Sequence, residues 1–133
     1  MRLATIDTNV LFEGLTREGD CGDVIDAWVA GSFTPCVSTA LALEYEATLT
    51  TKLGAPKRAF AVPAMQALLK RAAFVPVYFS LRPTSPDVGD DMIIECAFAS
   101  GSVIVTRNLK DLSVASSWGV PVFTPAEFLE LLP

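Results

Sequence analysis

The chain has 133 residues, which fits one compact domain, and 51% of them are apolar, enough to bury a substantial core. Charged residues make up 19% and the net charge is −5, so disorder is excluded and broad electrostatic binding of nucleic acid is weakly disfavoured. The chain has no histidine, which excludes Ser-His-Asp and Cys-His catalysis and leaves hydrolysis to carboxylates, acting with hard metal ions or as nucleophiles.

Apolar runs of strand type alternate with helical patterns from the N-terminus onward, which is typical of βα units around a parallel sheet. Residues 3–6 predict a buried first strand that leads directly into Asp7. Asp20 is suited to cap a helix that ends at Gly31, because aspartate accepts from free N–H groups and glycine favours helix ends. Residues 33–37 predict a short second strand.

The middle of the chain predicts two more helices and a third strand. Ser38 or Thr39 would cap a helix that runs to about Lys52. Glycine and proline punctuate residues 53–62, which predicts a loop, and residues 63–73 follow as a helix. Residues 74–79 predict the third strand.

The last third of the chain completes the sheet. Residues 81–89 predict a loop that delivers Asp90 and Asp91 to the start of an apolar helix over residues 92–99. Further strands are predicted at residues 102–106 and 120–123.

A capping box at Thr124 and Glu127 opens a short final helix. Together these elements predict one domain over residues 1–133, with a three-layer α/β/α architecture around a five-stranded, largely parallel sheet. In such sheets the ligand site lies at the carboxyl ends of the strands, near a switch in strand order.

Three cysteines, Cys21, Cys36 and Cys96, are odd in number and show no CxxC spacing, which predicts reduced, partly buried thiols. No apolar run approaches the roughly 18 residues that span a bilayer, and the N-terminus lacks a signal-peptide pattern. We therefore expect a soluble, cytoplasmic protein without a membrane partner.

Acidic residues recur where predicted strands end. Asp7 follows the first strand, although helix capping alone would also explain it. Glu44 and Glu46 lie about 200° apart on the next predicted helix, so at most one of them can face a given site. Periodicity does not choose between them. Asn108 and Asp111 again place oxygen ligands at the carboxyl end of a strand, here the fourth. A polar turn that caps the next helix would explain either residue equally well.

Asp91 and Glu95 are four residues apart and share one face of a helix that is apolar at most other positions. A helix packed nearly all round would partly desolvate both charges and make them repel each other, and a bound cation usually offsets that repulsion. Asp90 instead suits a helix cap or first turn. Asp7, Glu44, Asp91 and Asp111 all map to one rim of the predicted sheet, and clustered carboxylates select Mg²⁺ or Mn²⁺.

Four segments in order resemble motifs of the PIN-domain family, particularly the VapC-like toxin ribonucleases. They are Ile6-Asp7-Thr8-Asn9-Val10-Leu11, Val37-Ser38 with Leu43-Glu44-Tyr45-Glu46, Asp90-Asp91-Met92-Ile93-Ile94-Glu95-Cys96-Ala97, and Val105-Thr106-Arg107-Asn108-Leu109-Lys110-Asp111-Leu112. Each motif alone is weak, but four in the expected order and spacing are fairly specific and cover essentially the whole chain. The chain departs from the family pattern at Asn108, where many relatives have aspartate. This favours Asp111 as the fourth acidic residue of the site.

The resemblance implies a PIN-like fold and a Mg²⁺- or Mn²⁺-dependent ribonuclease that is the toxin of a type II toxin–antitoxin pair. It implies an RNA substrate cut to 5′-phosphate and 3′-hydroxyl ends, a cognate antitoxin whose tail enters the active-site groove, and a homodimer. The catalytic acids implied are Asp7, Glu44, Asp91 and Asp111; the metal ligands are these four and Asn108; the substrate contacts are Thr8, Asn9, Arg107 and Lys110. A second basic patch for RNA is formed by Lys52, Lys57 and Arg58, although solvated side chains explain the basic residues equally well.

Two alternatives remain. The segment around Asp7 also resembles the nucleophile loop of haloacid-dehalogenase-like phosphatases, and Gly89-Asp90-Asp91 resembles their distal acidic motif. Asn9 in place of the acid/base carboxylate, and the position of Asp90 and Asp91 at a helix start, count against that class, and a phospho-acceptor receiver domain is weaker still. A catalytically degraded PIN-like binding module stays open because of Asn108.

Overall fold

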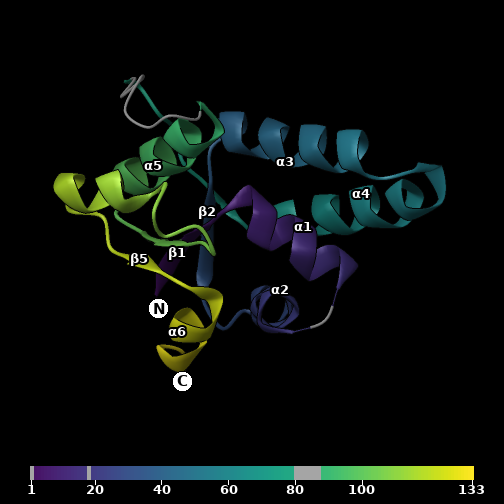
Figure 1. Ribbon diagram of the computed structural model, residues 1–133, viewed down its shortest axis with the longest axis horizontal. Coiled ribbons are helices and arrows are strands. Elements are labelled where there is room, and N and C mark those ends of the chain that lie inside the picture. Colours follow the sequence, from purple (N-terminus) through teal and green to yellow (C-terminus); the bar gives the residue numbers. More distant parts are fainter. Residues whose placement is uncertain (1, 18, 80–87) are drawn as a thin grey trace.

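The computed structural model describes residues 2–17, 19–79 and 88–133 of the chain (Figure 1). The elements in chain order are β1 (Leu3–Ile6), α1 (Thr8–Thr16), α2 (Asp20–Ala30), β2 (Thr34–Val37), α3 (Thr39–Lys52), α4 (Ala55–Leu69), β3 (Ala73–Phe74), α5 (Val88–Ser100), β4 (Val103–Val105), the 3₁₀ helix η1 (Ser113–Trp118), β5 (Val122–Phe123) and α6 (Pro125–Glu130). No helix among the described residues is both long and apolar enough to cross a membrane.

The five strands form one sheet in the order β3-β2-β1-β4-β5, and every neighbouring pair is parallel. This confirms the predicted α/β fold. In Figure 1, α5 lies on one side of the sheet, and α1, α2 and α4 lie on the other. The chain extends the sheet outward from β1 to β3 and then returns to place β4 on the other side of β1. The strand order therefore switches between β1 and β4, which is where ligand sites form in such sheets.

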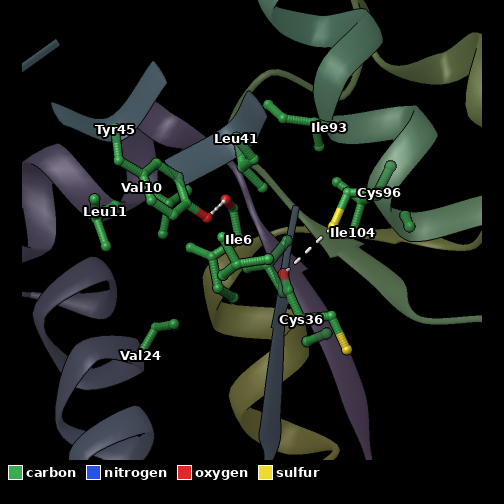
Figure 2. Packing of buried hydrophobic residues seen from close by; sticks show 14 of the residues in the cluster. Ile6, Val10, Leu11, Val24, Cys36, Leu41, Tyr45, Ile93, Cys96 and Ile104 are labelled. Atoms are coloured by element: carbon green, nitrogen blue, oxygen red, sulfur yellow. Dashed lines mark hydrogen bonds between the residues drawn. The ribbon is translucent and has the colours of Figure 1, made fainter. Parts of the chain in front are cut away.

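The core fills the space between the sheet and its covering helices (Figure 2). Strands buried on both faces need apolar side chains at nearly every position, and β4 is Val-Ile-Val for that reason. Two polar groups in this core bond to strand carbonyls: the Tyr45 hydroxyl donates to the Ile6 carbonyl, and Cys96 Sγ donates to the Cys36 carbonyl. All three cysteines are free and buried, as predicted.

The predicted loop at residues 53–62 is wrong, because α4 already begins at Ala55 and ends at Leu69. Gly54 is its N-cap, and Pro56 occupies the first turn, where a missing N–H removes no helical hydrogen bond. Glycine and proline are common both in loops and at helix starts, and here they form the start of a helix. Pro63 lies within the helix, which continues past it.

Other boundaries also differ from the prediction. Asp20 does not cap α2, since Gly19 is the N-cap and Asp20 is the first helical residue. The third strand is only Ala73–Phe74, because Pro76 has no N–H with which to continue the ladder beyond the Val75 bond to Val37. The predicted loop at residues 81–89 lies largely outside the described residues, and α5 begins earlier than predicted, at Val88.

Helices α1 and α2 approach each other closely at Gly14. A Cβ atom added there would lie 2.4 Å from Ile25 Cγ1 and 2.6 Å from the Cys21 carbonyl oxygen, which is too close for a side chain. We expect Gly14→Ala to lower the free energy of unfolding by about 1–3 kcal/mol, as overpacking usually does. Thermal and denaturant unfolding measure it. The comparison is Gly54→Ala, where a Cβ meets nothing within 4 Å and only the weaker N-cap preference of alanine acts, so the loss should be smaller. Equal unfolding curves for the two variants would contradict this close approach.

Candidate active site

Asp7 lies at the carboxyl end of β1, at the switch in strand order. Its N–H donates to the Val105 carbonyl at 2.9 Å, and its side chain is only 4% exposed. Although Asp7 occupies the N-cap position of α1, its side chain makes no capping hydrogen bond. Helix capping, the alternative explanation for this aspartate, therefore does not account for it.

Thr106, at the end of β4, orients the Asp7 carboxylate. Thr106 Oγ1 donates to Asp7 Oδ2 at 2.6 Å and accepts from the Asn108 N–H at 2.9 Å. Because the Asn108 N–H occupies a lone pair of the hydroxyl, the hydroxyl proton is free to point to the carboxylate. Sequence reasoning assigned no role to Thr106. The signal available for it was its position, directly after a buried strand that neighbours the strand before Asp7.

Two cavities meet at Asp7. The larger, of about 600 Å³, is lined by Asp7, Asn9, Glu13, Arg17, Gly19, Asp20, Cys21, Arg107 and Asn108. The smaller, of about 210 Å³, is lined by Asp7, Thr8, Asn9, Glu44, Thr48, Lys52, Gly89, Asp90 and Ile93. Asp7 and Asn9 belong to both walls, so they form the boundary between the two cavities.

The rotation of α3 places Glu44 at the smaller cavity. Leu41, Tyr45 and Leu49 are fully buried and define the inward face of the helix. Burial raises the pKa of the Tyr45 hydroxyl well above its usual value, so this group stays protonated and donates to the end of β1. Glu44 is half-buried beside this face and lines the cavity with Asp7, whereas Glu46 is exposed.

The acidic residues of α5 lie at different cavities, although the sequence pattern placed Asp91 and Glu95 on one face of the helix. Asp91 and Glu95 are 1% and 3% exposed, so the helix is packed nearly all round, as predicted. Glu95, however, lines a different cavity of about 330 Å³ with Ser38 and Thr39 at the start of α3. Asp90 lines the smaller cavity with Asp7 and Glu44, and Asp91 is buried one residue further along.

The segment after β4 places Asn108 at the larger cavity and Asp111 beside it. Asn108 Nδ2 donates to Asp111 Oδ2 at 2.7 Å, and Asp111 itself lines neither cavity that meets at Asp7. Arg107 lines the larger cavity, where its Nη1 forms a 2.8 Å ion pair with Glu13 Oε2. Lys110 is exposed and lines neither of the two cavities.

The sequence model of the PIN domain family matches residues 4–110, which is most of the chain. The chain belongs to the PIN-domain family. Among curated proteins, no sequence matches this PIN domain.

Solved structures share the fold of this PIN domain at low sequence identity. VapBC2 from Rickettsia felis, bound to a DNA fragment from its promoter, gives a TM-score of 0.66 at 12% identity, covering 92% of this chain and 98% of that one. FitAcB from Neisseria gonorrhoeae gives 0.64 at 18% identity, with the same coverage of 92% and 98%. FitAB bound to the IR36 DNA fragment gives 0.62 at 18% identity, covering 92% of this chain and 94% of that one. The TM-scores establish a common fold, and at identities this low they establish the fold alone.

PIN domains are generally nucleases that use divalent metal ions, so the oxygen groups around Asp7 have to suit such an ion. Among the residues that the structure describes, no three Asp, Glu or Cys side chains lie close enough together to hold a metal. Mg²⁺, however, commonly takes one or two protein carboxylates and completes its shell with water and substrate phosphate. Asp7 and Glu44 supply that number at the smaller cavity. Beside them, the buried Thr8 hydroxyl lacks a hydrogen-bond partner among the described residues. The donor set therefore fits Mg²⁺ or Mn²⁺.

Proposed function

We propose that this PIN domain is a Mg²⁺- or Mn²⁺-dependent ribonuclease that hydrolyses RNA phosphodiester bonds. The observation that carries the proposal is the Asp7 carboxylate, which is buried at the β1/β4 switch and held by Thr106 instead of capping α1. A carboxylate fixed in this way at the meeting point of two polar cavities is prepared for a cation and a substrate.

In this proposal Asp7 and Asp91 would hold the principal metal ion, and Glu44 would ligate it or orient a water molecule. Asn108 and Asp111 complete the site, with the Asn108 amide at the cavity and Asp111 fixing that amide by a hydrogen bond. When bound, the metal ion would lower the pKa of a water and neutralise negative charge on the reacting phosphate. The unpartnered Thr8 hydroxyl would donate to a water or phosphate oxygen, and Asn9 would contact the strand between the two cavities.

We further propose that the chain is the toxin of a toxin–antitoxin pair and acts as a homodimer. The similar structures of VapBC2 and FitAB, each bound to DNA, support an antitoxin partner; the homodimer rests on the family resemblance alone. In this setting Arg107 and Lys110 would contact the phosphates of RNA, and an antitoxin would block the same cavities. The phosphatase alternative loses support, because Asp90 and Asp91 lie in the first turn of α5, whereas the distal acidic motif of those phosphatases follows a strand.

The test is cleavage of a labelled single-stranded RNA by the purified protein, followed on a denaturing gel. We expect cleavage with Mg²⁺ or Mn²⁺, none with EDTA, and recovery when the metal is restored. Single-stranded DNA of the same sequence is the substrate control. A protein that binds Mn²⁺ in calorimetry yet cuts no RNA would overturn the ribonuclease, and one that neither binds Mn²⁺ nor cuts would indicate a degraded binding module.

A further inference from the structure

The larger cavity contains groups that the proposed hydrolysis leaves without a role, among them Arg17 and Glu13. Its volume of about 600 Å³ falls within the roughly 300–1,000 Å³ of small-ligand pockets, so it has room for a nucleotide. Two arginines line it, Arg17 from the end of α1 and Arg107 from the end of β4, together with the amides of Asn9 and Asn108. Three carboxylates, those of Asp7, Glu13 and Asp20, line it as well. Arginines beside neutral amides are the groups that contact phosphates and nucleotides.

Both arginines keep donors available for a ligand. Among the described residues, Arg107 is engaged only through Nη1, by Glu13 Oε2 at 2.8 Å and by a long 4.0 Å contact with Cys21 Sγ, and the side chain is 62% exposed. A guanidinium has five N–H donors, so most of those on Arg107 remain. The Arg17 side chain is exposed and makes no ion pair or hydrogen bond with the described residues. Burial raises the pKa of the Cys21 thiol, so this group adds no negative charge to the cavity.

The smaller cavity continues the path on the other side of Asp7. Lys52 lines its wall, with Nζ held 5.3 Å from the centroid of the Phe12 ring. Cations therefore lie on both sides of Asp7, and Asn9 forms the boundary between the two cavities. This arrangement of cations on both sides of Asn9 suits a strand of phosphates that crosses the first turn of α1. Unpaired nucleotides can turn their bases into such cavities, whereas the bases of a duplex remain stacked and paired.

We propose that the larger cavity is a nucleotide subsite for single-stranded RNA, in which Arg17 and Arg107 bind the phosphate next to the one cut at Asp7. The inference rests on the proposed ribonuclease function and gives the path of its substrate: the strand passes Arg17 and Arg107, crosses Asn9 and passes Lys52. Glu13 acts as an internal competitor, because its carboxylate occupies the Arg107 donor that the phosphate would otherwise take.

The experiment measures binding separately from cleavage. A fluorescein-labelled oligouridylate of about twelve nucleotides, within the range of single-strand site sizes, is titrated in metal-free buffer with the Asp7→Asn variant as background. We expect added Arg17→Gln or Arg107→Gln to weaken binding by about two- to fivefold each, as for exposed charge pairs. Each should also make the dependence of log K on log salt shallower by about 0.7, the value for one phosphate contact on a single strand. A duplex of the same length should bind more weakly.

Two matched variants make the result decisive. Arg2→Gln removes the same charge from an exposed arginine at the amino end of β1, the opposite rim of the sheet, and should leave affinity and salt slope unchanged. Glu13→Gln should tighten binding by freeing Arg107. The subsite is overturned if Arg17→Gln and Arg107→Gln behave like Arg2→Gln, or if Glu13→Gln weakens binding. Normal binding by a wild-type protein that cuts no RNA would overturn the ribonuclease and leave the subsite standing.

Discussion

Asp7→Asn lowers metal-dependent RNA cleavage by at least about a hundredfold, because it removes the charge that holds the ion at the β1/β4 switch. Stabilisation by a metal ion is worth several kcal/mol, and each 1.4 kcal/mol corresponds to about a tenfold change in rate. The loss should not come from unfolding, since the asparagine oxygen can still accept the hydrogen bond from Thr106. Initial cleavage rates in saturating Mn²⁺ measure the effect, and circular dichroism with thermal unfolding checks the fold.

The matched control for this variant is Asp26→Asn, which removes the same charge from an exposed position on α2. Its cleavage rate should equal that of the wild type. Cleavage by Asp7→Asn at the control rate, with contaminating nuclease excluded, would show that Asp7 does not hold the catalytic metal. Asp91→Asn in the same assay tests the second proposed ligand, and Asp90→Asn shows which acid of the first turn of α5 serves the site.

Glu44→Gln should reduce cleavage by orders of magnitude while Glu46→Gln remains close to the wild type. The two side chains lie on opposite sides of Tyr45, whose buried hydroxyl fixes the rotation of α3 against β1. Only Glu44 then lines the cavity with Asp7. Glutamine keeps the size and hydrogen bonding of either residue and removes the charge. For the exposed Glu46, we expect a change of within about half a kcal/mol in the free energy of unfolding.

Cleavage kinetics and thermal unfolding of both variants separate the outcomes. Loss of cleavage in Glu46→Gln alone would mean that α3 is rotated relative to the arrangement described here. Loss in both variants would mean that the charge of the helix, and not one ligand, supports activity.

Strong local signals account for what the sequence predicted well. β1 is buried from Ala4 to Ile6, Ser38 caps α3 by accepting from the Leu41 N–H, and Thr124 with Glu127 forms the predicted capping box. Such elements are set by the hydrogen bonding of a few neighbouring residues, so they are visible in the sequence.

Features that depend on distant contacts were not predictable in the same way. The start of α4 was missed because Gly54 and Pro56 are equally common in loops and at helix starts. Periodicity could not choose between Glu44 and Glu46, because the choice depends on the contact of Tyr45 with β1. The position of Thr106 over Asp7 depends on strand order, which no local pattern encodes.

The Thr106–Asp7 hydrogen bond joins residues that are 99 positions apart in the chain. During synthesis, Asp7 emerges early, but its carboxylate is oriented only after β4 has been made and has inserted beside β1. Contacts of such long sequence separation form late, because the loop they close carries a large entropy loss. The growing chain therefore has no oriented Asp7 carboxylate until β4 has been made and has paired with β1. A nuclease built in this order would gain its oriented metal-binding carboxylate only when β4 joins the sheet.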